Sequence, residues 1–354
     1  MQISGVEVDP HDLAHREDEL RARSGKMRMR DVSTSLNVPE AALLEVRSTR
    51  GEARRIARLM DDEAGFKPVL ERMGDAGEVM ALTRNEHCVH EKHGTYTSPQ
   101  FYGAMGQVVG EIDLRLFLQH WQYGYCLEEK LEGDRTRLSL QFFDGYGDAI
   151  HKIYATSATD HAAFQQLAQV FHDAAPAAPV FDTRPPTADE RPDAEIDIAG
   201  FRIGWASLEH SHEFYGLLKR FEVTRHQAMR LGGSDYARPV SARAMKTVLE
   251  TCSERQIPMM IFVGNEGCVQ IHSGPVERIE TMGPWLNVLD PRFNLHLRED
   301  RVAAAYVVRK PSARGDIHSL ELFDEHGLCF VQAFGERKPG ESEREDWREV
   351  LGRL

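Results

Sequence analysis

Alternating apolar and polar residues mark several strands in both halves of the chain. They occur at Ile112–Leu118, Arg137–Phe143, Arg301–Arg309 and Ser319–Phe323. This alternation is typical of antiparallel strands that place one face on a core and the other in water. The sequences Asp144-Gly145 and Glu325-His326-Gly327 follow two of these runs and predict hairpin turns.

Helical patterns precede the strands in each half. Residues 39–45 predict a helix, with Asn37 or Ser35 as its cap and Pro39 in its first turn. The segment Ser207–Met229 predicts a helix in the second half. Because helices and strands are grouped, the sequence predicts an α+β fold in which each half is a large antiparallel sheet with flanking helices.

Two pairs of sequence blocks indicate that the halves are copies of one another. The block Met80–His90 (MALTRNEHCVH) aligns with Met260–Gln270 (MIFVGNEGCVQ), and Ser139–Gly147 (SLQFFDGYG) aligns with Ser319–Gly327 (SLELFDEHG). Both pairs have the same offset of 180, and ten of their twenty positions are identical. Since this period far exceeds the ~20–50 residues of repeat arrays, we expect a two-copy domain.

A segment rich in proline and alanine separates the two copies. Ala174–Glu195 holds five of the sixteen prolines and shows neither a helical nor a strand period, so it predicts a semi-extended linker. The expected domains are a first repeat at residues 1–173, the linker at 174–195, and a second repeat at 196–354.

Composition narrows the function classes. The 354 residues are 41% hydrophobic and 28% charged, as in ordinary globular proteins, and the net charge of −13 does not favour nucleic acid or an anionic membrane as partner. No apolar run reaches the roughly 18–20 residues that span a bilayer, and the acidic N-terminal segment predicts no secretory signal. Five cysteines without a CxxC pair argue against a disulfide framework or a four-cysteine zinc site, so we expect a reducing cytoplasm.

Two local patterns carry alternative hypotheses. The histidines of Glu86–His93 invite a metal site, but strand geometry puts His90 on the opposite face from His87 and His93, which favours solvated or structural histidines. The segment Val32–Leu44, followed by Arg47, Arg50, Arg54, Arg55 and Arg58, has the form of a DNA-binding helix-turn-helix. Interspersed glutamates and aspartates favour instead a helical hairpin that packs on the sheet. No Walker A loop, GxSxG elbow or HExxH motif supports phosphate-cradling or acyl-transfer chemistry.

Two histidines in the segment Ser207–Arg220 are candidate ligands. On a helical wheel His210 falls within the apolar face, whereas His212 lies at its edge, about 160° away. An edge position combines apolar neighbours with access to a cleft, so periodicity weakly favours His212.

The run Ala206–Arg230 reads ASLEHSHEFYGLLKRFEVTRHQAMR. It is similar to D-V-H-x-F-F-x-L-L-K-R-H-x-x-[ST]-R-x-Q-A, the second-half pattern of the bacterial hemin-degrading and haem-trafficking family of the HemS/ChuS/PhuS type, which the chain therefore resembles. The similarity continues through both halves, at residues 77–86 (GEVMALTRNE), 112–117 (IDLRLF), 293–298 (FNLHLR), 308–311 (VRKP), 319–324 (SLELFD) and 334–340 (FGERKPG).

The resemblance implies one haem b per chain, held in a cleft between the halves. It assigns His212 as the proximal iron ligand, and a neutral imidazole is an ordinary ligand of haem iron. Cations suit the propionates at the cleft mouth. The remaining implied contacts are Arg115 and Phe117 on the distal side, Arg225 one turn beyond the ligand segment, and Lys310, Gln332 and Arg337 at the propionates.

Two positions depart from the family pattern. Phe334 stands where members often have tyrosine, so a hydroxyl contact is missing there. Ser211, preceded by His210, replaces the usual D-V, which makes His210 an alternative ligand in an altered state.

The resemblance implies a cytoplasmic haem carrier in iron acquisition, with a haem ABC importer and a haem oxygenase as partners. An enzyme that itself opens the porphyrin is the alternative, and a DNA-binding regulator using Val32–Leu44 is a third. Membrane insertion is not expected, and a homodimer of the apo form stays open.

Overall fold

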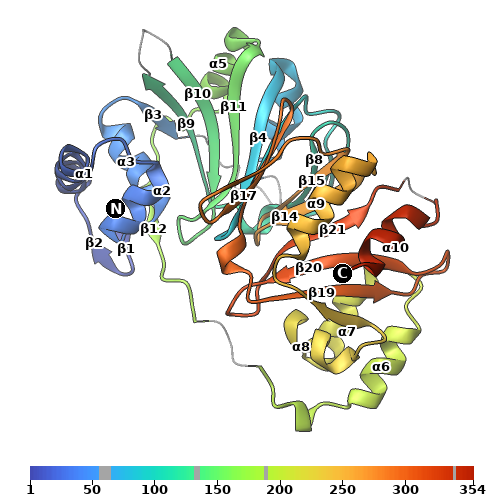
Figure 1. The fold of residues 1–354 in the computed structure, drawn as a ribbon. Coiled ribbons are helices and arrows are strands. Elements are labelled where there is room, and N and C mark those ends of the chain that lie inside the picture. The colour runs from blue at the N-terminus through green and yellow to red at the C-terminus, as the bar shows by residue number, and fades with distance from the viewer. Residues whose placement is uncertain (56–64, 131–135, 187–189, 338–339) are drawn as a thin grey trace. The chain divides into compact units, whose positions relative to one another are not determined.

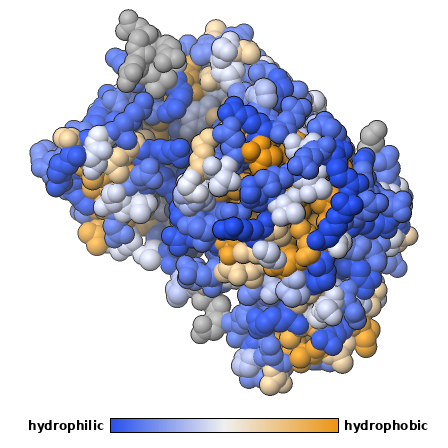
Figure 2. Space-filling model, in the orientation of Figure 1, coloured by the Kyte–Doolittle hydropathy of each residue, from blue (hydrophilic) through white to orange (hydrophobic). Residues whose placement is uncertain are grey.

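The computed structural model describes residues 1–55, 65–130, 136–186, 190–337 and 340–354 (Figure 1). Its strands form two nine-stranded antiparallel sheets and one three-stranded sheet, so the predicted α+β class is confirmed. Hydrophilic residues cover most of the face seen in Figure 2, in keeping with the 28% of charged residues. None of the helices described has both the length and the apolar character needed to cross a membrane.

The chain divides into two compact units that exchange a short segment. Unit 1 comprises residues 1–84, 91–186 and 265–270, and unit 2 comprises residues 85–90, 187–264 and 271–354. Each unit therefore contains residues of both halves of the chain. The exchanged segments lie within β5 (Cys88–Gly94) and β15 (Cys268–Gly274) and the turns that precede them.

Unit 1 is built on a sheet with the strand order β4-β11-β10-β9-β3. Helices α2 and α3 pack on one face, where Leu43 and Leu44 are buried with Tyr125 and Leu127. Helices α4 and α5 contribute buried residues to a second hydrophobic core of the unit. The helices are α1 (Pro10–Ser24), α2 (Met29–Leu36), α3 (Glu40–Thr49), α4 (Lys67–Glu71) and α5 (His161–Val170). The strands are β1 (Gln2–Ile3), β2 (Val6–Glu7), β3 (Ala53–Arg55), β4 (Gly77–Arg84), β6 (Gln100–Tyr102), β7 (Met105–Val108), β8 (Asp113–Phe117), β9 (Tyr123–Lys130), β10 (Thr136–Phe143), β11 (Ala149–Thr159) and β12 (Val180–Phe181).

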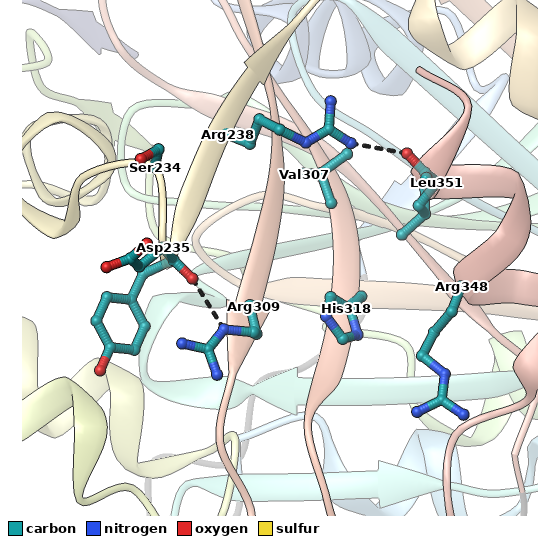
Figure 3. A pocket seen from close by; sticks show the side chains of 10 residues that line it. Ser234, Asp235, Arg238, Val307, Arg309, His318, Arg348 and Leu351 are labelled. Carbon is teal, nitrogen blue, oxygen red and sulfur yellow. Dashed lines mark hydrogen bonds between the residues drawn. The ribbon is translucent and has the colours of Figure 1, made fainter.

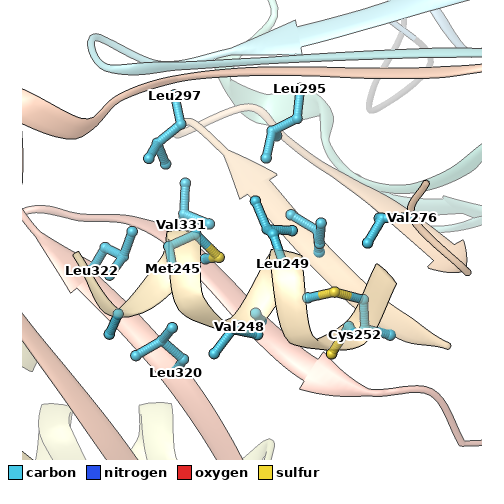
Figure 4. Packing of buried hydrophobic residues seen from close by; sticks show 14 of the residues in the cluster. Met245, Val248, Leu249, Cys252, Val276, Leu295, Leu297, Leu320, Leu322 and Val331 are labelled. Carbon is cyan, nitrogen blue, oxygen red and sulfur yellow. The ribbon is translucent and has the colours of Figure 1, made fainter. Parts of the chain in front are cut away.

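Unit 2 repeats this plan with the strand order β13-β19-β20-β21-β14. Helix α9 places Met245, Val248, Leu249 and Cys252 on the sheet at helical spacing (Figure 4). Helix α10 shares that core, and α6, α7 and α8 pack in a second one. The helices are α6 (Ile198–Ala206), α7 (Glu213–Phe221), α8 (Arg225–Gly232), α9 (Ala244–Arg255) and α10 (Glu345–Gly352). The strands are β13 (Ala237–Val240), β14 (Met259–Gly264), β16 (Ile279–Met282), β17 (Trp285–Asp290), β18 (Phe293–Arg298), β19 (Ala304–Lys310), β20 (Ile317–Phe323) and β21 (Cys329–Gly335).

The four strands predicted from alternation are confirmed as β8, β10, β19 and β20, and the two predicted turns join β10 to β11 and β20 to β21. The predicted cap of α3 is wrong, because Asn37 adopts the left-handed conformation that ends α2 and Pro39 precedes the first residue of α3.

The helical hairpin of residues 32–44 packs on the sheet, as predicted. Two of the arginines that follow it pair with acidic residues of α1: Arg47 with Glu17 at 2.5 Å, and Arg50 with Asp18 at 2.7 Å. Arg58 lies outside the described residues.

The segment Ala174–Glu195 is more structured than its composition predicts. Strand β12 pairs in parallel with β1, and Phe181 is fully buried in the core against α3 and β9. Arg184 pairs with Asp144 at 2.6 Å and with Glu266 at 2.8 Å. A short strand and ion pairs therefore hold the described parts of this segment in place. The proline content did not predict these contacts.

A buried polar network distinguishes the core of unit 1. The His151 imidazole is fully buried, with Nδ1 2.8 Å from the Thr83 hydroxyl and Nε2 2.5 Å from the Tyr96 hydroxyl. Burial lowers the pKa of His151 to about 3. At the offset of 180, all three positions are valines in unit 2: Val263, Val276 and Val331. The fold itself therefore does not require this network.

We expect His151 to make the protein sensitive to acid. Below pH 6.5 the unfolded imidazole binds a proton that the folded one excludes until about pH 3. As the pH falls from 6.5 to about 3, the free energy of unfolding should therefore decrease by about 1.4 kcal/mol per pH unit. Above pH 6.5 this residue should not affect it. Urea unfolding between pH 7 and pH 4 measures the slope. The variant His151→Gln retains hydrogen-bonding groups but does not titrate, so equal slopes in the two proteins would contradict the assignment.

Candidate functional site

The two candidate histidines lie in a turn and not on a helix. Helix α7 begins at Glu213, and residues 207–212 form turns and bends between α6 and α7, so the prediction of one helix from Ser207 to Met229 is wrong. The Glu213 carboxylate accepts the backbone N–H groups of Glu209 at 2.8 Å and His210 at 3.1 Å. This reach-back contact at the helix N-terminus favours a turn over further helix, and these bonds hold the pKa of Glu213 below its ordinary value.

Both imidazoles are exposed on this turn. His212 is the residue immediately before α7, and its side chain makes no capping hydrogen bond. Within the described part of the chain, no hydrogen bond or ion pair engages the His212 ring, so its nitrogens are accessible. The argument that buried His210 in an apolar helix face is therefore wrong, and the geometry of the turn leaves both rings available.

Behind α7, a buried carboxylate gathers two cations. Glu321 on β20 is fully buried and accepts from Arg225 at 2.7 and 2.9 Å, from Lys310 at 2.6 Å and from the Ser319 hydroxyl at 2.9 Å. The Arg225 and Lys310 cations lie 5.4 and 5.0 Å from the centre of the Phe214 ring on α7. We call Glu321, Arg225 and Lys310 the buried charge cluster, in which Glu321 and Lys310 are buried and the Arg225 side chain is 29% exposed. The cluster holds one more cation than anions.

Opposing effects set the charges of this cluster. Burial by itself would raise the pKa of Glu321, but the charges of Arg225 and Lys310 and their hydrogen bonds outweigh it and hold that pKa well below its ordinary value. Burial lowers the pKa of Lys310, and Glu321 only partly opposes this effect. Burial also raises the pKa of the neighbouring Cys329 thiol to about 12, so Cys329 is neutral.

The other second-half candidates lie on or just after β21. The Gln332 amide oxygen, turned towards Arg225, accepts from its guanidinium, which joins Gln332 to the buried charge cluster. The Phe334 ring packs edge-on against Phe262 with ring centres 5.0 Å apart. Arg337 follows the strand, and its Nε is buried without a partner among the described residues.

Arg115 and Phe117 lie on β8 in unit 1. Leu114 and Leu116 are fully buried, so strand alternation turns Arg115 and Phe117 to the opposite face. Arg115 donates to the Asp113 carboxylate and, at 3.0 Å, to the Leu114 carbonyl, and its side chain is 40% exposed. Burial raises the pKa of Asp113, although the charge of Arg115 opposes this effect. The distal roles of Arg115 and Phe117 stay predictions.

Glu321 is the residue that the sequence reasoning missed. The alternation of Ser319–Phe323 puts Glu321 with Ser319 on the face predicted to be in water, opposite Leu320 and Leu322, but in the structure both faces of β20 are buried. A charged residue at a buried strand position requires a partner of opposite charge. The partners, Arg225 and Lys310, come from helix α8 and strand β19. The local sequence pattern does not predict where these two elements lie relative to β20.

Unit 1 has a different polar pair at the corresponding place. Helices α2 and α3 match α7 and α8, because Asn37 and Glu222 both end the first helix in the left-handed conformation. Counted from this residue, Glu40 takes the place of Arg225, and its carboxylate pairs with Lys152. The same count puts Met27 opposite His212, so the first repeat carries no equivalent histidine.

The chain belongs to the family described as the haemin-degrading HemS.ChuX domain, whose model matches residues 37–171 and 222–354. It is 36% identical over 327 residues to the hemin transport protein HmuS of Yersinia pestis, and 36% identical over 335 residues to the hemin transport protein HemS of Yersinia enterocolitica. Each alignment covers 92% of both chains.

Solved structures of haem proteins are similar to this chain over nearly its full length. Holo-PhuS, a heme-binding protein from Pseudomonas aeruginosa, is similar with a TM-score of 0.92 and 40% identity over 97% of this chain and 98% of that chain. ChuS, described as an Escherichia coli heme oxygenase, is similar with a TM-score of 0.86 and 34% identity over 97% of this chain and 99% of that chain. The resemblance found in the sequence motifs is confirmed.

We expect the substitution Glu321→Gln to lower the free energy of unfolding by about 3 kcal/mol or more, because it leaves Arg225 and Lys310 without their anion in a buried site. Urea unfolding at neutral pH measures the loss. The matched control is Glu129→Gln, which removes the exposed pair of Glu129 with Arg137 (2.7 Å) and should cost under about 1 kcal/mol. Equal losses in the two variants would refute the role of Glu321.

Proposed function

We propose that this protein binds one haem, with His212 as the iron ligand, and carries it in the cytoplasm to a haem oxygenase after delivery by a haem importer. Membership of the haemin-degrading family and the alignment over 92% of two hemin transport proteins support haem as the cargo. The observation that carries the assignment is the accessible His212 ring immediately before α7, the helix whose Phe214 ring lies against the Arg225 and Lys310 cations.

The residues of unit 2 fit a haem in three respects. An accessible neutral imidazole is a normal ligand of haem iron. The buried charge cluster holds one cation in excess of its anion, which suits a carboxylate ligand. The Arg337 Nε is a buried donor without a partner among the described residues, and such a donor favours an incoming acceptor. We infer that Lys310, Gln332 and Arg337 serve the propionates.

The ligand preference for His212 over His210 depends on the register of the family motif, because the turn leaves both rings exposed. Both imidazoles are exposed on one turn, so His210 is the natural substitute when His212 is removed. Met27 replaces the histidine in the first repeat, which supports a single haem per chain.

We expect His212→Ala to shift the Soret and ligand-field bands of the hemin-loaded protein and to weaken hemin binding. The matched variant His210→Ala should leave the resting spectrum nearly unchanged. Absorption spectra of the single and double variants measure both effects, and the double variant should lose any low-spin histidine signature that His212→Ala retains. A native spectrum abolished by His210→Ala alone would show that the motif register is wrong.

An enzyme that opens the porphyrin ring is the second candidate, because ChuS, 34% identical, is described as a heme oxygenase. The distinction requires hemin-loaded protein, an electron donor, air and catalase. For a carrier, we expect the Soret band to persist until an acceptor haem oxygenase is added. Steady conversion to a linear tetrapyrrole with release of iron, without any acceptor, would replace the carrier proposal with the enzyme.

A further inference from the structure

Unit 2 has a hollow on the sheet face opposite the buried charge cluster. It is an open cavity of about 250 Å³ between β13, β19, β20 and α10 (Figure 3). Arg309 and His318 pair across β19 and β20 and point into it, whereas their neighbours Lys310 and Ser319 point to the other face. Its lining residues are Ser234, Asp235, Tyr236, Arg238, Val307, Arg309, His318, Arg348, Leu351 and Gly352.

Three arginines from three elements line this hollow. Arg238 of β13 donates to the Leu351 carbonyl at 2.8 Å, and Arg309 of β19 pairs with Asp316 at 2.9 Å. Arg348 of α10 is exposed. In the part of the chain that the structure describes, neither Arg238 nor Arg348 has an acidic partner within ion-pair distance, although the chain carries 13 excess negative charges.

His318 adds a fourth polar group. Its Nδ1 lies 2.7 Å from the nearly buried carboxylate of Glu343, which holds the ring in the wall of the hollow. The ring of Tyr236 forms a further wall, with the Arg309 guanidinium 4.8 Å from its centre. The hollow thus combines side chains that hydrogen bonds hold in place, Arg238 and His318, with the exposed side chain of Arg348.

Unit 1 contains a corresponding hollow, in which Arg54 is the one cation among the described lining residues. Residues Gly51, Glu52, Arg54, Cys126, Glu128, Leu138, Gln165, Ala168 and Gln169 surround a cavity of about 110 Å³. Strand pairing defines the correspondence, because Leu138 faces Glu128 across β10 and β9 as His318 faces Arg309 across β20 and β19. Arg54 likewise pairs with Cys126 as Arg238 pairs with Val307.

The helices that close the two hollows correspond in the same way. Helix α10 buries Trp347, Val350 and Leu351, and α5 buries Phe164, Leu167 and Ala168 at the same spacing. Gln165 therefore takes the place of Arg348. The fold leaves a hollow at this place in both repeats. Arg54 keeps the place of Arg238, whereas Glu128, Leu138 and Gln165 stand where unit 2 has Arg309, His318 and Arg348. Packing of the fold does not explain these three residues of unit 2.

We propose that the arginine-lined hollow of unit 2 binds a small organic anion that carries a carboxylate or phosphate group. Guanidinium groups recognise such oxyanions through paired, charge-assisted hydrogen bonds. The volume lies below the roughly 300–1,000 Å³ of drug-sized sites, which favours a ligand of few atoms. The site is separate from His212, because it uses the opposite face of the sheet.

Calorimetric titration of the full chain tests this site, with inorganic phosphate and succinate as separate probes at low ionic strength. We expect saturable one-to-one binding of at least one probe, and the stronger probe identifies the phosphate or carboxylate class. Arg348→Gln and His318→Leu install the residues of the unit 1 hollow and should weaken binding about tenfold, the effect of losing a charged hydrogen bond. Arg348 is exposed, so its replacement spares the core.

The matched control is Arg54→Gln in the unit 1 hollow, which should leave binding unchanged. The proposal is overturned if neither probe binds at concentrations up to about 10 mM, if Arg348→Gln and His318→Leu have no effect, or if Arg54→Gln weakens binding equally. The hemin spectrum of each variant should stay native, which separates failure of this site from failure of the haem proposal.

Discussion

Two asparagine side chains, one in each unit, hold the exchanged segments in place through hydrogen bonds to the neighbouring strands. In unit 2 the Asn85 amide donates to the carbonyls of Gly264 at 3.0 Å and Phe330 at 2.7 Å. In unit 1 the Asn265 amide donates to the carbonyls of Arg84 and Ile150, both at 2.9 Å. Each Oδ1 also accepts two backbone N–H groups of its own turn. All hydrogen-bonding capacity of both amides is used, and only an amide supplies two donors and an acceptor in this geometry.

With this frame shared, the repeats differ in the polar groups they bury. Unit 1 holds the network of His151, Thr83 and Tyr96, where unit 2 has valines. Next to the matched helix pairs, unit 1 buries Glu40 with Lys152, whereas unit 2 buries Glu321 with Arg225 and Lys310. Buried charges are costly unless paired, so these pairs are weak evidence for added stability. The cluster of unit 2 holds one cation more than its anion, and α7, whose Phe214 ring lies against both cations, begins directly after His212.

The sheet of unit 2 therefore presents different chemistry on its two faces. One face carries the buried charge cluster under α7, and the other carries the arginine-lined hollow against α10. Adjacent residues such as Arg309 and Lys310 serve opposite faces because side chains alternate along a strand. A single strand can thus contribute to two sites without a conflict in packing, which explains how both sets of cations are accommodated in one repeat.

The sequence by itself determined the duplication, the α+β class, four of the strands and the family, because alternation and repeated motifs are local or directly comparable features. It did not determine where α7 begins, since the reach of Glu213 back to two N–H groups competes with helix continuation and only the folded turn shows which prevails. The segment exchange, the structured β12, the pairing of Glu321 and the arginine-lined hollow were decided by tertiary structure. Each joins residues far apart in the chain, and such pairing depends on strand order and register, which no local pattern encodes.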